Sequence, residues 1–150
     1  PPPPISRGSG QILNSLKDWK RLIETVDSPS NGLTWDCGVT REIGEDPVAV
    51  CRYFGTRDRI NHIHFRNVKM QVPREHYIEV FDDDGDNDMF AVMREIVRVK
   101  YKRLVMPEHP RGLDNDKGQH NGGYTGWVLN VGYARAMLQT ALMQEQGRDK

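Results

Sequence analysis

The sequence predicts an α/β fold in which about three parallel strands alternate with four helices. Segments whose apolar residues recur every three or four positions alternate along the chain with short apolar runs that end at Gly, Pro, Asn or Asp. This alternation is typical of parallel strands joined by crossover helices. Three parallel strands alone leave two unpaired edges and bury their helices poorly. We therefore expect them to belong to a larger sheet or to pair with a partner.

The first half of the chain predicts two helices around one strand. Apolar residues at helical spacing run from about Ser9 to Val26, and turn-forming residues follow them. A short apolar run at 32–35 predicts a strand that ends at Asp36 and Cys37. The pair Asp46-Pro47 has the composition of a helix start, and Gly55 is placed to end that helix.

The second half predicts two further strands, each followed by a helix. Residues 60–65 predict a strand with His62 and His64 on one face, and a loop follows from 69 to about 85. Residues 86–88 cap a helix that extends to about residue 101, and residues 104–106 predict the third strand. A Gly- and Asn-rich loop over 112–123 leads into the last helix, and the tail at 145–150 is polar.

Composition excludes several classes of function. Lys and Arg together number 21, as do Asp and Glu, so no net field draws the chain to nucleic acid or anionic lipid. No apolar run reaches the length of a membrane span, and no signal-peptide pattern opens the chain. Two cysteines are too few for a disulfide framework. We therefore expect a cytoplasmic protein that binds neither nucleic acid nor membrane.

Each predicted strand is followed by side chains that can bind a metal or move a proton. They are Asp36 and Cys37 at the first strand, His62, His64, Arg66 and Asn67 at the second, and Glu108 and His109 at the third. Because active sites of α/β proteins form at the carboxyl ends of strands, these residues predict a metal site there.

Other candidate residues have plainer explanations. Cys51 lies within a predicted helix and is expected in the core, and one of the two strand histidines fits a hydrogen-bonded core position equally well. His76 and His120 lie in predicted loops and are expected to be exposed. The acidic run over 82–88 does not match the spacing of an EF-hand, so we interpret it as a helix cap with additional loop acids.

Five segments in order resemble the mannonate dehydratase family of the xylose-isomerase-like (β/α)₈ (TIM) barrels. They are Asn31-Gly-Leu-Thr-Trp-Asp-Cys-Gly38, His62-Ile-His-Phe-Arg-Asn-Val68, Phe81-Asp-Asp-Asp-Gly-Asp-Asn-Asp-Met89, Met106-Pro-Glu-His109 and Gly123-Tyr124. The resemblance covers nearly the whole chain. It implies a single partial domain over 1–150, the C-terminal half of the barrel, with 1–8 as a proline-rich lead-in. The opening prolines, with no Met, resemble the stretch just after a family strand, which suggests a cut inside a longer gene product.

The resemblance implies a divalent metal, typically Mn²⁺, with Fe²⁺, Co²⁺ and Zn²⁺ also compatible with the ligand set. Its ligands would be Cys37, His64 and Glu108, with a further family histidine outside this sequence. The family has its cysteine directly after an aromatic residue, whereas Asp36 intervenes here, so Asp36 is the alternative ligand. Glu108 stands where the family has aspartate, which lengthens the carboxylate arm by one methylene.

The implied activity is dehydration of D-mannonate to 2-dehydro-3-deoxy-D-gluconate in hexuronate catabolism. His109 and Tyr124 resemble the catalytic acid–base pair, with their order left open, and Arg66 and Asn67 are candidates to bind the substrate's carboxylate and hydroxyls. The expected partners are a sugar acid, the N-terminal half of the barrel and further copies of the protein. The alternatives are a sugar isomerase or epimerase of the same superfamily, or an inactive half-barrel fragment. We expect the isolated chain to be inactive.

Overall fold

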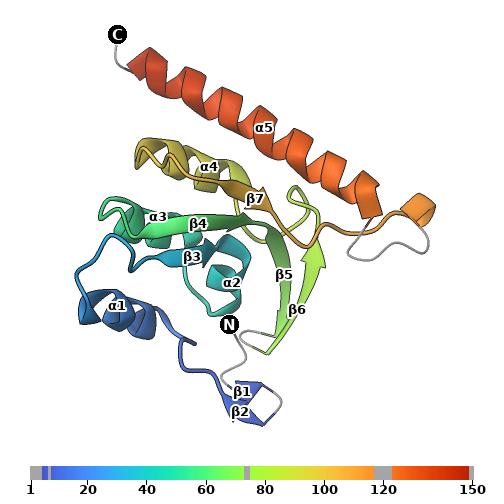
Figure 1. Ribbon diagram of the computed structural model, residues 1–150. Coiled ribbons are helices and arrows are strands. Elements are labelled where there is room, and N and C mark those ends of the chain that lie inside the picture. Colours follow the sequence, from blue (N-terminus) through green and yellow to red (C-terminus); the bar gives the residue numbers. More distant parts are fainter. Residues whose placement is uncertain (1–4, 7, 73–74, 117–122, 149–150) are drawn as a thin grey trace.

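The structure contains a three-stranded parallel sheet with helices packed against it (Figure 1). The computed structural model describes residues 5–6, 8–72, 75–116 and 123–148. Within these residues the sheet has the order β3-β4-β7, formed by Leu33–Asp36, Ile60–Phe65 and Val105–Pro107. Both strand pairs are parallel, so the predicted α/β fold is confirmed.

Two capped helices connect the strands of this sheet. α3 (Pro47–Gly55) follows β3 in the chain, and α4 (Met89–Arg98) comes between β4 and β7. The side chains of Asp46 and Asp88 each accept a hydrogen bond from a backbone N–H in the first turn of their helix. Such caps satisfy donors that the helix itself leaves unpaired, which explains why both helices begin where the sequence predicts.

The first helix starts later than predicted. α1 (Leu16–Thr25) is capped by Ser15, whereas residues upstream form a small antiparallel hairpin of β1 (Ile5–Ser6) and β2 (Ser9–Gly10). Gly8, in the turn of this hairpin, has a φ of +79°, a conformation that glycine adopts without steric cost. The apolar period that predicted a helix from Ser9 is therefore interrupted by a turn and a cap.

Besides the β1–β2 hairpin, the sequence did not predict α2, β5 or β6. α2 (Cys37–Glu42) has only six residues, too few to display a helical period. β5 (Asn67–Val72) and β6 (His76–Val80) pair as an antiparallel hairpin, most of which lies in the segment from 69 to about 85 that was expected to be a loop. Most of their side chains are exposed or half-buried, so the apolar alternation that marks a strand is weak there.

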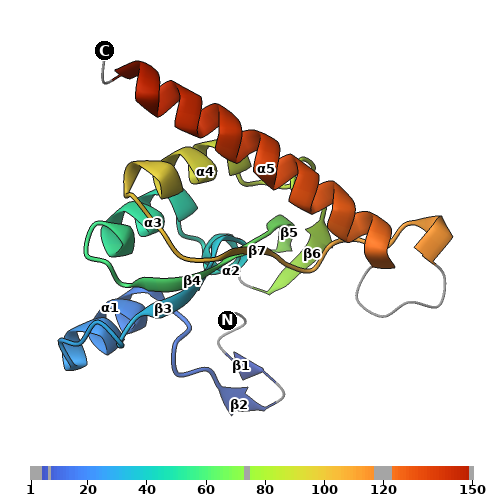
Figure 2. The same cartoon turned by 45° about the horizontal axis from the view of Figure 1, so that its top comes forward.

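The last helix lies across one side of the sheet. α5 (Gly123–Arg148) passes diagonally over α4 and β7, and both views show it extending beyond the sheet (Figures 1 and 2). Its residues Ala134, Met137 and Ala141 are buried at spacings of three and four. This is the face that packs against the rest of the protein.

The two faces of β4 have different environments. Ile63 and Phe65 are fully buried in the core, whereas His62 and His64 lie on the opposite face with their ring centroids 5.2 Å apart. Core residues from the helices and from β3 complete the apolar side; they include Trp35, Phe54, Val92 and Met93. The core thus anchors the sheet from one face and leaves the histidine face available for a site.

Candidate metal centre

Three side chains that can bind a metal meet at the carboxyl ends of the parallel strands. Asp36 is the last residue of β3, His64 lies in β4, and Glu108 follows β7 directly. Asp36 stands opposite His64 in the register of the sheet. One ligand atom from each of the three lies within 4.8 Å of the others. The parallel register therefore creates the group, because it aligns the ends of three strands that are distant in sequence.

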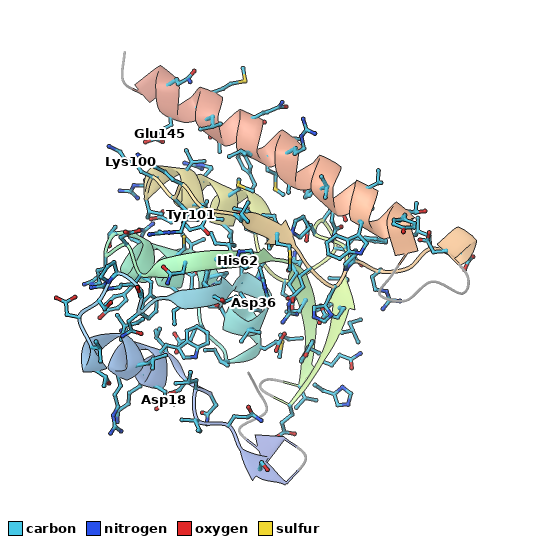
Figure 3. All side chains as sticks on the ribbon, in the orientation of Figure 1. Asp18, Asp36, His62, Lys100, Tyr101 and Glu145 are labelled. Atoms are coloured by element: carbon cyan, nitrogen blue, oxygen red, sulfur yellow. The ribbon has the colours of Figure 1, made fainter. Side chains whose placement is uncertain are left out.

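The distances within this group are short. His64 Nδ1 lies 3.0 Å from Glu108 Oε2 and 3.7 Å from Asp36 Oδ2. All three side chains are mostly buried, with exposed fractions of 12% for Asp36, 24% for His64 and 21% for Glu108. Figure 3 labels Asp36 and His62, which lie on the neighbouring strands β3 and β4. Two carboxylates and an imidazole at this spacing form a compact donor set for a divalent cation.

The electrostatics of the group favour a cation. Burial raises the pKa of Glu108, and the neighbouring carboxylate of Asp36 raises it further, whereas His64 and His109 act in the opposite direction. A carboxyl group whose pKa is raised by a second carboxylate gains from any positive charge that neutralises both. The group therefore has the charge pattern of a cation site.

Cys37 lies beside this group but is turned away from it. Its side chain is fully buried, and Sγ donates to the carbonyl oxygens of Arg66 at 3.2 Å and His64 at 3.4 Å. Burial raises the pKa of the thiol strongly, and Asp36 adds to the effect. Because Sγ is directed at these two backbone carbonyls, it is not among the ligand atoms that meet at the strand ends. Of the two ligands that the sequence left open, the structure brings Asp36 into the group.

Asp36 has this orientation because it also caps a helix. It is the N-cap residue of α2, and its Oδ1 accepts a hydrogen bond from Val39 N at 2.8 Å. Cys37 is the first residue of that helix, and its side chain contacts the backbone carbonyls of His64 and Arg66. The start of α2 thus decides which of the two neighbouring side chains reaches the site.

Arg66 is surrounded by carboxylates. Its side chain is 5% exposed, and its three nitrogen atoms contact Asp36 Oδ2 at 2.9 Å, Glu42 Oε1 at 2.7 Å and Glu79 Oε1 at 2.9 Å. Glu108 Oε2 lies 3.5 Å from Nε of the same guanidinium. Arg66 therefore adjoins two of the three donors, and its expected contact with substrate stays a prediction.

Asn67 fastens the loop after β6. Its Nδ2 donates to the carbonyl oxygens of Asp82 at 2.9 Å and Asn87 at 3.1 Å, and its Oδ1 accepts from Asn87 N at 3.0 Å. A Cβ on Gly85 would lie 2.1 Å from Asn67 Cγ, so this close approach requires glycine. The structure gives Asn67 a structural function, and its contact with substrate stays a prediction.

The two residues expected to move protons lie farther toward the surface. His109 has a left-handed backbone, with φ of +47°, and its Nε2 lies 3.7 Å from Glu108 Oε2. A non-glycine residue in this conformation is strained, and such strain often accompanies functional sites. Tyr124 lies at the start of α5 and is 77% exposed. The position of His120 falls outside the described residues, and His76 is exposed as expected.

An open pocket adjoins the group. It has a volume of about 480 Å³, and its lining includes Glu108, His109, Arg111 and Trp127. Arg111 is exposed, and its Nη1 donates to a backbone carbonyl at 3.2 Å. A ligand in this pocket would lie against Glu108 and His109 at once.

Sequence reasoning missed Glu42 and Glu79 as parts of the site. Glu42 comes from α2 and Glu79 from β6, two elements that the sequence did not predict. An acidic residue on an exposed loop gives no signal by itself. The signal that remained was Arg66, because a buried arginine needs carboxylate partners.

The described part of the chain contains no helix that is both long and apolar enough to cross a membrane.

Comparison with known proteins identifies the family. The family model of D-mannonate dehydratase matches residues 1–148. A mannonate dehydratase of Enterococcus faecalis is 32% identical over 139 residues, which span 88% of this chain and 37% of that protein. A mannonate dehydratase of Thermotoga maritima is 28% identical over 134 residues, with the same coverage. The chain thus spans less than half the length of the relatives that it matches.

Solved structures show the same fold. The crystal structure of mannonate dehydratase from Streptococcus suis serotype 2 superposes with a TM-score of 0.86 at 24% identity, covering 93% of this chain and 41% of that one. A xylose isomerase domain protein of Alicyclobacillus acidocaldarius gives a TM-score of 0.65 at 16% identity, with 93% and 48% covered. The predicted part of a (β/α)₈ barrel is confirmed as a fold, and its assignment to the C-terminal half stays a prediction. Because the family model matches almost every residue, the chain belongs to the D-mannonate dehydratase family.

Proposed function

We propose that this chain is the C-terminal half of a metal-dependent lyase that dehydrates D-mannonate to 2-dehydro-3-deoxy-D-gluconate. The observation that carries the proposal is the group of Asp36, His64 and Glu108, whose ligand atoms lie within 4.8 Å of one another at the carboxyl ends of the strands. Membership of the D-mannonate dehydratase family supports the choice of reaction.

The proposed ligands are Asp36, His64 and Glu108, with Asp36 in place of the initially expected Cys37. Two carboxylates and one imidazole suit Mn²⁺, and Fe²⁺, Co²⁺ and Zn²⁺ also accept such donors. When bound, the cation supplies Lewis-acid stabilisation of the negative charge that develops on the substrate's carboxylate. Three protein ligands leave coordination positions for substrate oxygens and for the further histidine expected from the other half of the barrel.

His109 and Tyr124 are the proposed acid–base pair. One removes the C2 proton, and the other donates a proton to the C3 hydroxyl, which leaves as water. The resulting enol then takes up a proton at C3 and loses its C2 hydroxyl proton, which gives the 2-oxo acid. The proximity of His109 to Glu108 supports its part in this scheme, since both line the same pocket.

The proposed partner is the N-terminal half of the barrel. Among the described residues, β3 and β7 each pair with β4 alone, so each presents one open edge. An apolar groove of about 510 Å³ between α4, β7 and α5 continues the β7 edge and includes Val105, Val131 and Leu138. Strands and helices of the N-terminal half would cover both the open strand edges and the groove.

Assembly with further copies and a cytoplasmic location are also proposed. Val128 and Met143 on α5 are exposed apolar side chains, which supports the assembly. Cys37 and Cys51 are both free, which suits the cytoplasm.

The test is product analysis. The chain, an N-terminal half-barrel supplied as a second polypeptide, and the mixture of both are each incubated with D-mannonate and Mn²⁺ and followed by NMR. We expect 2-dehydro-3-deoxy-D-gluconate from the mixture and no turnover from the chain alone. An epimer or a keto-isomer of the substrate would assign the protein to the isomerases or epimerases of the superfamily. No conversion by a folded, metal-loaded mixture would support an inactive half-barrel.

A further inference from the structure

The contacts of Arg66 are typical of a residue that orients neighbouring side chains, not of one that binds a substrate. Its side chain is 5% exposed, and each of its three nitrogen atoms is bound by a different carboxylate, from Asp36, Glu42 and Glu79. An arginine that binds a substrate carboxylate needs two neighbouring N–H groups free to form a bidentate pair. Here the N–H groups of the guanidinium already form hydrogen bonds to carboxylates of the protein.

We propose that Arg66 is a positioning residue that fixes the Asp36 and Glu108 carboxylates in the orientation that a metal requires. The inference rests on the proposed metal centre, which it extends beyond the three ligands. It assigns Glu42 and Glu79 to the same arrangement, as the anchors that hold Arg66 itself.

The contacts of Asp36 carry the first part of this inference. Its Oδ1 accepts from Val39 N at 2.8 Å and its Oδ2 from Arg66 Nε at 2.9 Å, so both oxygens are fixed. Each carboxylate oxygen can accept more than one hydrogen bond or ligand contact. The remaining capacity of Oδ2 is on the side of His64, whose Nδ1 lies 3.7 Å away. Arg66 thereby determines where Asp36 offers a ligand atom.

Glu108 is held from two sides. Its Oε2 lies 3.0 Å from His64 Nδ1 and 3.5 Å from Arg66 Nε. Glutamate has one more rotatable bond than aspartate, so its carboxylate needs more support to occupy one position. Arg66 Nε, like His64 Nδ1, lies within 4.0 Å of the carboxylate at the end of β3 and of the one directly after β7. It therefore couples the positions of two ligands.

The carboxylates around Arg66 carry more negative charge than its guanidinium can neutralise, which favours a further cation. Four carboxylates lie within 4.0 Å of Arg66, whose guanidinium carries a single positive charge. A buried cluster with an excess of carboxylates is stabilised when a further cation joins it. Arg66 alone orders the carboxylates without neutralising them.

The Arg66 side chain packs closely against the backbone at Gly38. A Cβ on Gly38 would lie 2.8 Å from Arg66 Cζ and 3.0 Å from its Cγ. Because three carboxylates pin the guanidinium, the side chain cannot move aside without losing at least one of them. Gly38→Ala is thus a variant that displaces Arg66 while every charge in the site is retained.

The experiment measures Mn²⁺ affinity of the chain by the electron paramagnetic resonance of free Mn²⁺. Arg66→Lys keeps the positive charge but removes the planar guanidinium that contacts several carboxylates. Gly38→Ala keeps the arginine but displaces its side chain. We expect each to weaken Mn²⁺ binding by about tenfold or more, the usual effect of removing a partner that orients a ligand. Arg52→Lys, which alters a bidentate pair with Glu95 outside the site, is the matched control and should leave the affinity unchanged.

An unchanged affinity in folded Arg66→Lys would overturn the proposal, since the charge alone would then suffice. If circular dichroism shows Arg66→Lys to be unfolded, Gly38→Ala decides in the same way. If neither the parent chain nor its mixture with the N-terminal half-barrel binds Mn²⁺, the metal centre fails, and crystal structures of the variants then test Arg66 separately. Asp36 and Glu108 carboxylates in their original positions beside a displaced Arg66 would overturn its positioning role.

Discussion

Asp36 and His64 stand opposite one another in the parallel register of β3 with β4, with His64 Nδ1 3.7 Å from Asp36 Oδ2. Their side chains share the face of the sheet opposite the apolar core, and Glu108 joins them from the end of β7. A register shift of one residue would place either side chain on the other face. The sheet register is therefore the physical basis of the proposed site.

The first prediction separates the two candidate ligands of β3. Asp36→Asn should reduce Mn²⁺ affinity by about tenfold or more, because it removes an anionic ligand while asparagine still caps α2. Cys37→Ala should leave the affinity within about twofold, although it should lower the melting temperature by removing a buried side chain. Isothermal titration with MnCl₂ measures the affinities. The reverse pattern would return the ligand role to Cys37.

The second prediction concerns His109. In the assembled barrel, His109→Ala should lower kcat by roughly 10²-fold or more, the scale of one acid–base group, and leave Mn²⁺ binding intact. Steady-state kinetics with D-mannonate gives kcat, and metal analysis of the same sample is the control. Turnover equal to that of the parent would exclude His109 as acid or base.

The third prediction concerns the buried carboxyl of Asp82. Asp82 is 2% exposed, and neither of its carboxylate oxygens has a hydrogen-bond partner among the described residues. Burial, with a contribution from Asp83, raises the pKa of Asp82 from 3.8 to about 7. The folded chain therefore binds a proton that the unfolded chain releases between about pH 4 and 7. The free energy of unfolding should fall as the pH rises through this range.

Asp82→Asn should remove that part of the pH dependence. We expect the variant to be more stable than the parent at pH 8, by about 1–3 kcal/mol, and the difference to shrink toward pH 4. Urea unfolding of both proteins at pH 4, 6 and 8 measures it. A difference that stays constant with pH would show that Asp82 does not titrate in this range.

The fourth prediction concerns the close approach of Gly85 to Asn67. Gly85→Ala would place a Cβ 2.1 Å from Asn67 Cγ and should destabilise the chain by about 1–3 kcal/mol. Gly132→Ala is the matched control, since a Cβ there meets nothing within 4 Å in the middle of α5. Alanine should stabilise that helix by about 0.5–1 kcal/mol. Thermal unfolding of the two variants should shift in opposite directions, and a shared direction would contradict the assignment.

Periodicity and strand-end composition were sufficient to predict the parallel strands and to place Asp36, His64 and Glu108 among the residues at their carboxyl ends. The alternation in β4 placed His64 on the face opposite Ile63 and Phe65, as the structure has it. The family resemblance supplied the rest of the barrel, which three strands could not specify. Both depend on patterns that extend over many residues, and such patterns survive local irregularity.

The details that sequence could not supply depend on short elements. Asp36 rather than Cys37 reaches the group because α2 begins at that point, and a helix of six residues leaves no period to recognise. The partners of Arg66 could not be named because Glu42 lies on α2 and Glu79 on β6. Contacts between charged side chains from distant segments require the tertiary structure.

The most direct test of the proposed metal centre is anomalous diffraction from crystals of the chain soaked in MnCl₂. We expect one strong peak with Asp36 Oδ2, His64 Nδ1 and Glu108 Oε2 at roughly 2.0–2.3 Å, the range of bonds between divalent cations and such ligands. The same soak of a His64→Ala crystal should lose the peak. Mn²⁺ bound elsewhere on the chain, with none between these three side chains, would contradict the account.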